Sequence, residues 1–156
     1  MFGLFRKKTP PKTLFPDDQK KSDMANAIAE LLGIQLLILP PEHKRIENDD
    51  GHIYRKAVGY IYGYIDAFPR MRGLDMSNIE IGPPIIFHVF RKLFPECDPL
   101  RYVEFLSANL RDETVNLGIM HGGQQCIDYS KPGVGGAPIG LSRFILEESA
   151  LQEGRA

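Results

Sequence analysis

The sequence contains no tryptophan, only two cysteines, and no apolar run longer than four residues. The cysteines, Cys97 and Cys126, lack the Cys-x-x-Cys spacing of a metal or redox site, and two of them do not make a disulfide framework. The longest apolar run, at 36–39, falls far short of the roughly 20 residues that a membrane-spanning helix needs. These absences predict free thiols and a cytoplasmic location.

No charge of one sign dominates the chain, whose net charge is -1. Without tryptophan or an extended basic surface, we predict no nucleic-acid partner. Residues 1–21 differ from the rest, because they carry six lysines or arginines against two aspartates, together with three prolines. They are predicted to form a basic, proline-containing tail. Residues 1–12 either stay solvated or make a weak contact with an anionic membrane surface.

The remaining sequence contains residues that are typical of helix starts. Asp98 followed by Pro99 is a typical helix start, Asp112 is a second capping residue, and Pro83-Pro84 suits the first turn of a helix. The predicted helices cover residues 22–36, 52–67, 83–94, 99–110, 112–129 and 138–149. The sequence therefore predicts an all-α protein, a single compact bundle of about six helices within a domain at 22–150.

Two of the predicted helices each carry a pair of glycines four residues apart. Gly59 and Gly63 lie in the helix at 52–67, and Gly118 and Gly122 lie in the helix at 112–129. Glycine costs a helix about 1 kcal/mol relative to alanine, so two in one turn indicate that another backbone approaches closely. We predict that these two helices cross at their glycines.

The same spacing suggests an internal duplication. The glycine pairs recur at an offset of 59 residues, and Ile81-Gly82 recurs as Ile139-Gly140 at an offset of 58. The chain would then consist of two three-helix units, at 22–95 and 97–150. Coincidence is the alternative, because short matches between glycine-containing segments are common.

The glycine face of the helix at 52–67 is a candidate protein interface. The glycines lie away from the main apolar face, and Tyr60 and Tyr62 are expected to flank them as an exposed pair, a composition found at contact surfaces. The candidate interface residues are Gly59, Tyr60, Tyr62, Gly63 and Asp66. The alternative is that the same residues pack within one chain.

The helix at 112–129 carries a polar stripe. Thr114, Gly118, His121, Gln125 and Asp128 follow one another at spacings of four, three, four and three, so they share a face. Thr114, His121, Gln125 and Asp128 are candidate ligand-binding residues, in which His121 and Asp128 would act as base and orienting group. The alternatives are a solvent-facing stripe or a small buried network that fixes the helix crossing.

The sequence lacks the known signatures of catalysis. It contains no His-Glu-x-x-His spacing, no Gly-x-Ser-x-Gly elbow, no phosphate-binding loop and no dinucleotide fingerprint. His88 lies among apolar residues and is predicted to be a hydrogen-bonded core histidine. We therefore assign no catalytic residue, no metal and no cofactor.

These candidate residues support two hypotheses for the function of the protein. The first is a non-enzymatic cytoplasmic helical interaction module, which uses the glycine and tyrosine groove to form a homodimer or to contact another protein. The second is a small-molecule-binding protein or enzyme with its site on the His121, Gln125 and Asp128 stripe.

Overall fold

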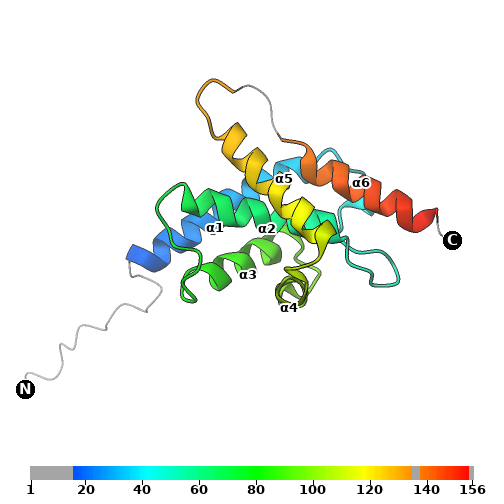
Figure 1. The fold of residues 1–156 in the computed structure, drawn as a ribbon, viewed down its shortest axis with the longest axis horizontal. Coiled ribbons are helices and arrows are strands. Elements are labelled where there is room, and N and C mark those ends of the chain that lie inside the picture. Colours follow the sequence, from blue (N-terminus) through cyan, green and yellow to red (C-terminus); the bar gives the residue numbers. More distant parts are fainter. Residues whose placement is uncertain (1–15, 135–137, 155–156) are drawn as a thin grey trace, which may run out of the picture.

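The computed structural model describes residues 16–134 and 138–154, and within them the chain forms six α-helices (Figure 1). The helices are α1 (Pro16–Leu36), α2 (Arg55–Arg70), α3 (Gly82–Leu93), α4 (Pro99–Asn109), α5 (Glu113–Tyr129) and α6 (Gly140–Glu153), with a 3-10 turn at Pro41–His43. In these residues the only β pairing is an isolated bridge between Glu47 and Ile53. The predicted all-α fold is confirmed. In the described part of the chain, no helix is long and apolar enough to cross a bilayer.

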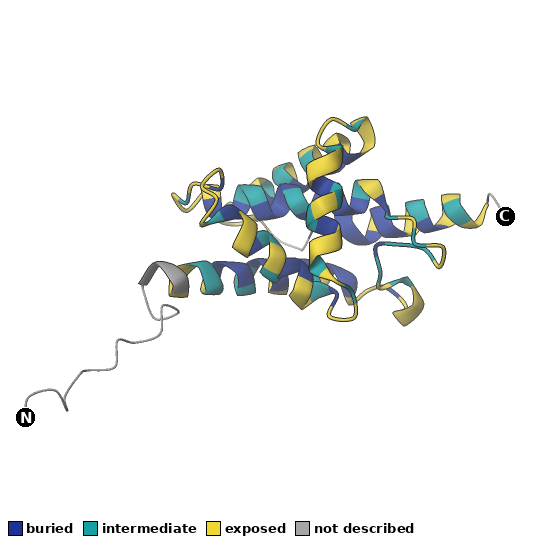
Figure 2. Ribbon diagram, turned by 90° about the horizontal axis from the view of Figure 1, so that it is seen from below, coloured by how far each residue is buried: buried dark blue, intermediate teal, exposed yellow. Residues whose placement is uncertain are grey.

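The core lies around α2, which runs through the middle of the bundle. α5 packs along one side of α2, while α1, α3 and α6 contact its other sides. Figure 2 shows that buried residues gather on the helix faces that turn toward one another, and that exposed residues follow the outer faces. This arrangement matches the long apolar face that the sequence of α2 presents.

Two predicted helix starts are confirmed by their capping bonds. Asp98 accepts a hydrogen bond from the backbone N–H of Leu100 at 3.0 Å, and Asp112 accepts one from Val115 at 3.0 Å. Each carboxylate satisfies a donor that the first helical turn leaves without a partner. The sequence therefore located the starts of α4 and α5 correctly.

Several predicted helix boundaries differ from the structure, most of all the start of α1. α1 begins at Pro16, six residues before the predicted start, because proline is well tolerated at the first position of a helix. The predicted tail is thus shorter than 21 residues, and its candidate membrane contact at 1–12 lies outside the described residues. α2 continues through Pro69 to Arg70, and the N–H groups of Arg72 and Leu74 then bond to the Pro69 carbonyl.

The predicted internal duplication is not confirmed. Two three-helix units would require α1, α2 and α3 to be arranged like α4, α5 and α6. α1 packs along α3, but in the described part of the chain α4 and α6 make no contact of comparable extent. The two halves share the glycine pair in their middle helices and an Ile-Gly start of their third helices, at Gly82 of α3 and Gly140 of α6.

Candidate functional site

The glycines of α2 and α5 form the closest contact in the bundle. A methyl group built on any of the four would lie 2.0–2.2 Å from a carbonyl oxygen of the opposite helix, where no carbon atom fits. The contacts are reciprocal: Gly59 with Val115 (2.2 Å), Gly63 with Ile119 (2.1 Å), Gly118 with Lys56 (2.1 Å) and Gly122 with Tyr60 (2.0 Å). The predicted crossing of these two helices at their glycines is confirmed.

This crossing determines which of the candidate interface residues on α2 are still accessible at the surface. Because α5 of the same chain lies directly on Gly59 and Gly63, their backbone is buried within one molecule. Asp66 is partly exposed and forms an ion pair with Arg70 at 3.0 Å. Tyr62 is half-buried. Of the five candidate interface residues, only Tyr62 and Asp66 therefore present side chains toward the surface.

Tyr60 is fully buried, so the expectation of two exposed tyrosines beside the groove is wrong for this residue. Its ring packs edge-on against Phe144 with 5.8 Å between centroids, and its hydroxyl donates a hydrogen bond to Gln125 Oε1 at 2.6 Å. Burial raises the pKa of the hydroxyl well above its usual value. A helical wheel of α2 cannot show that Tyr60 is buried, because the residue that packs against its ring, Phe144, belongs to α6.

The polar stripe of α5 does not converge on one site. The His121 ring packs edge-on against Phe144, with 5.4 Å between centroids. Asp128 lies at the surface with Gln124 and Lys131, at 2.9 and 3.4 Å. Thr114 is exposed. The side chains thus meet three different environments along the helix.

Gln125 has a structural partner at the start of α6. Its Oε1 accepts hydrogen bonds from the Tyr60 hydroxyl and from the backbone N–H of Gly140 at 3.2 Å. Gln35 of α1 accepts the next N–H, that of Leu141, at 3.0 Å. Two glutamine side chains, from α5 and α1, therefore cap α6, whose own preceding residue provides no side-chain cap. The sequence offered a small buried network that fixes the helix crossing as an alternative to a ligand site. The observed network is partly buried: its Tyr60–Gln125 bond joins α2 to α5, and its other bonds cap α6.

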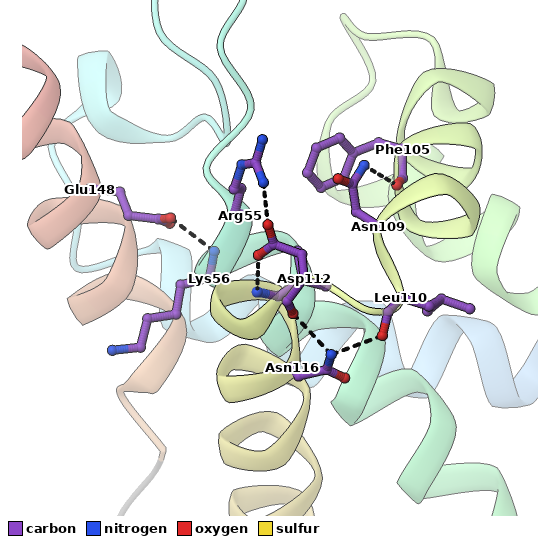
Figure 3. A network of polar contacts seen from close by, with 9 residues as sticks. Arg55, Lys56, Phe105, Asn109, Leu110, Asp112, Asn116 and Glu148 are labelled. Carbon is purple, nitrogen blue, oxygen red and sulfur yellow. Dashed lines mark hydrogen bonds and ion pairs between the residues drawn. The ribbon is translucent and has the colours of Figure 1, made fainter.

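Glu148 of α6 provides a similar cap for α2 (Figure 3). Its two carboxylate oxygens accept the N–H groups of Lys56 and Ala57 at 2.8 and 3.0 Å. Burial raises the pKa of this carboxyl above its ordinary value, although the two N–H groups and the Lys56 ammonium favour the charged form. Glu148 was not among the predicted residues, because a cap 92 residues away in the chain leaves no local signal.

Glu148 also lines a polar cleft of about 400 Å³. Its lining residues are His52, Ile53, Arg55, Phe105, Glu148, Leu151 and Gln152. Arg55 forms an ion pair with Asp112 (Figure 3), and Gln152 accepts a hydrogen bond from Asn48 at 3.2 Å. Several of the polar groups in this cleft thus already stabilise the fold.

An apolar groove lies between α2, α3 and α4. It encloses about 130 Å³ and is lined by Tyr62, Pro83, Ile86, Val103, Leu106, Ser107 and Leu110. Tyr62 is the only residue that it shares with the candidate interface, and Leu110 at its margin is 47% exposed. Sequence analysis did not bring these residues together, because they come from three helices.

The remaining candidate residues have simple roles. His88 Nε2 lies 3.1 Å from Asn26 Oδ1, so the predicted hydrogen bond is present, but the residue is only partly buried and does not belong to the core. Cys97 and Cys126 are free thiols. Burial raises the pKa of the Cys126 thiol to about 12, so this group stays protonated at neutral pH. No cluster of potential metal ligands occurs among residues 16–134 and 138–154.

Comparison of the chain with protein families, with curated proteins and with solved structures finds no match.

Proposed function

We propose that the chain is a non-enzymatic, cytoplasmic helical interaction module, which binds a protein partner at the apolar groove. The observation that carries this proposal is that three helices supply apolar side chains to one small surface hollow, and that Tyr62 lies in it. Tyrosine beside aliphatic residues is the composition of the energetically important centre of many interfaces.

The size of the apolar groove favours a protein over a small molecule. Its volume of about 130 Å³ is well below the roughly 300 Å³ at which small-molecule pockets begin. A hollow of this size accommodates one large apolar side chain, as an anchor residue of a partner protein requires. The proposed occupant is therefore an apolar anchor side chain on a segment of another protein.

The alternative function, a ligand site or catalytic site on α5, has less support. Gln125 is engaged with Tyr60 and Gly140, and His121 and Asp128 lie in different environments. A base and its orienting group need to lie within hydrogen-bonding distance of each other. The stripe offers no such pair among the bonds described above.

Two leucines, Leu100 in α4 and Leu110 directly after its end, provide a matched test. Leu110 lines the apolar groove and is 47% exposed, whereas Leu100 does not line it and is 48% exposed. Proximity labelling in cells with the wild type, Leu110→Glu and Leu100→Glu identifies proteins lost only with Leu110→Glu. We then expect the purified partner to bind Leu110→Glu at least tenfold more weakly than Leu100→Glu. A partner set that is identical for the two variants would contradict the proposal.

A further inference from the structure

The outward side of α5 carries a second regular pattern. Its residues follow one another at spacings of four, three, four, three and four, which is the spacing of a coiled-coil seam. We call these residues the outer seam: Glu113, Leu117, Met120, Gln124, Ile127 and Lys131. Five lie on α5, and Lys131 follows its end. The centre of the seam lies opposite Gly118 and Gly122, the residues that touch α2.

The apolar residues of the outer seam are exposed to solvent. Met120 is 67% exposed, Leu117 46% and Ile127 40%. α5 packs extensively on α2 and slightly on α6, and Figure 1 shows it crossing over α2 at the edge of the bundle. Single exposed apolar residues are normal on a protein surface, but three at the spacing of a helix-pairing seam indicate a contact surface.

The outer seam is complementary to itself when two copies run antiparallel. Leu117 and Ile127 are equally distant from residue 122, as are Met120 and Gln124, and as are Glu113 and Lys131. In an antiparallel pair centred there, Leu117 faces Ile127 of the second copy, and Met120 faces Gln124. Glu113 then faces Lys131 at both ends, which places opposite charges together. A parallel pair would instead oppose Glu113 to Glu113 and Lys131 to Lys131.

From this complementarity we infer that the outer seam is a homodimer interface, in which α5 pairs antiparallel with α5 of a second copy. Lys131 is exposed and lies 3.4 Å from Asp128 of its own chain. Its long, flexible side chain can contact either this carboxylate or that of Glu113 in the second copy. The 17 residues of α5 give a helix about 25 Å long. One helix pair of this length buries a modest area, so the dimer dissociates on dilution. This surface does not include the apolar groove, and the two proposals fail independently.

The first test measures mass in solution with matched methionine variants. Met120→Glu places charges at the centre of the proposed seam, whereas Met71→Glu changes an exposed methionine in the loop after α2. By sedimentation of the full chain, we expect the wild type and Met71→Glu to form a dimer at high concentration. Met120→Glu raises the dissociation constant at least roughly 100-fold, with an unchanged circular dichroism spectrum. A wild type that stays monomeric up to about 0.5 mM overturns the inference, and so does a dimer that Met120→Glu leaves intact.

The second test determines orientation by exchanging the terminal charges. Glu113→Lys and Lys131→Glu each create two like-charged contacts in the antiparallel dimer, and each raises the dissociation constant by roughly tenfold at low salt. The double variant restores opposite charges and recovers most of the affinity. If the dissociation constant of the double variant is raised by as much as the effects of the two single variants added together, the antiparallel pairing is overturned.

A cross-link then fixes the register. In a Cys97→Ser background, mixing Met120→Cys with Gln124→Cys is expected to give a disulfide-linked dimer under mild oxidation, because these positions face each other. Met120→Cys alone gives little product. If Met120→Cys alone cross-links efficiently and the mixture gives only that homodimer, with no disulfide between positions 120 and 124, the helices pair in parallel and the proposed interface is wrong.

Discussion

The crossing of α2 with α5 and the contact between α3 and α4 bring two helix pairs together by opposite means. At the first, four glycines expose backbone, and carbonyl oxygens of one helix lie where the other would carry a side chain. At the second, large rings fill the space, with Phe90 stacked on Tyr102 at 5.3 Å between centroids and Phe94 near the same ring at 6.3 Å. The first contact requires that the glycines carry no side-chain atoms, whereas the second is formed by large aromatic side chains.

This difference predicts different responses to mutation. Side chains in a packed cluster adjust their rotamers after a change, whereas two helix backbones in contact move only as whole helices. Adding one carbon atom at the glycine crossing should therefore destabilise the protein more than reshaping a whole ring between α3 and α4.

The largest effect is expected for Gly122→Ala. Its new methyl group would lie 2.0 Å from the carbonyl oxygen and 2.8 Å from the carbonyl carbon of Tyr60. We expect the free energy of unfolding to fall by about 3 kcal/mol, although alanine is the better helix former. Urea titration followed by circular dichroism measures this change.

The neighbouring Gly123→Ala is the matched control for that experiment. A methyl group there meets its nearest atom, the Gly63 carbonyl oxygen, at 3.6 Å, an ordinary contact distance. Alanine at this position should stabilise the protein by about 0.5–1 kcal/mol through its higher helix propensity. If both substitutions changed the free energy of unfolding by the same amount, the backbone contact would not be the reason that position 122 requires glycine.

A smaller effect is expected for Phe90→Leu between α3 and α4. The substitution removes the stacked ring opposite Tyr102 but leaves an apolar side chain of similar reach. We expect a loss of about 1 kcal/mol, measured in the same urea titration. A loss larger than that of Gly122→Ala would reverse the comparison between the two contacts.

The smallest effect concerns the pH dependence of the Glu148 cap. Burial holds the pKa of Glu148 above its ordinary 4.5, so the folded protein binds this proton more tightly than the unfolded chain does. The resulting stabilisation is complete below pH 4.5 and is lost as the pH rises through the folded-state pKa. Between pH 4 and 7 the wild type should therefore lose stability relative to Glu148→Gln, whose side chain does not titrate.

Glu147→Gln provides the control for this pH series, because Glu147 is half-exposed and makes only ion pairs with Lys56 and Arg143. The same pH-dependent difference in this variant would assign the effect to surface charge. Asp112 does not interfere, since hydrogen bonding to Val115 and the charge of Arg55 lower its pKa below 3.8. Its contribution to stability is lost only in more acidic solutions.

The features that could be predicted from the sequence are those with a local physical cause. A glycine pair within one helical turn is costly unless a backbone contacts it, so the spacing of Gly59 and Gly63 identified the crossing with α5. An aspartate before a proline identified the start of α4 in the same way.

The features that escaped prediction join residues of different helices. Tyr60 was expected at the surface because its cover, Phe144, comes from α6. Gln125 was a candidate ligand-binding residue because polar residues on a helix face give no indication of whether they meet a ligand or the start of another helix. The apolar groove combines residues of three helices, and no periodicity within one helix indicates it.

The caps on α2 and α6 have a consequence for synthesis on the ribosome. The start of α2 is capped by Glu148, which follows Lys56 by 92 residues, and the start of α6 is capped in part by Gln35, which precedes Leu141 by 106. A nascent chain that ends before α6 leaves both N–H groups of α2 without their acceptor. The bundle therefore reaches its native state only after α6 has emerged from the exit tunnel, and shorter nascent chains are the ones that need chaperone protection.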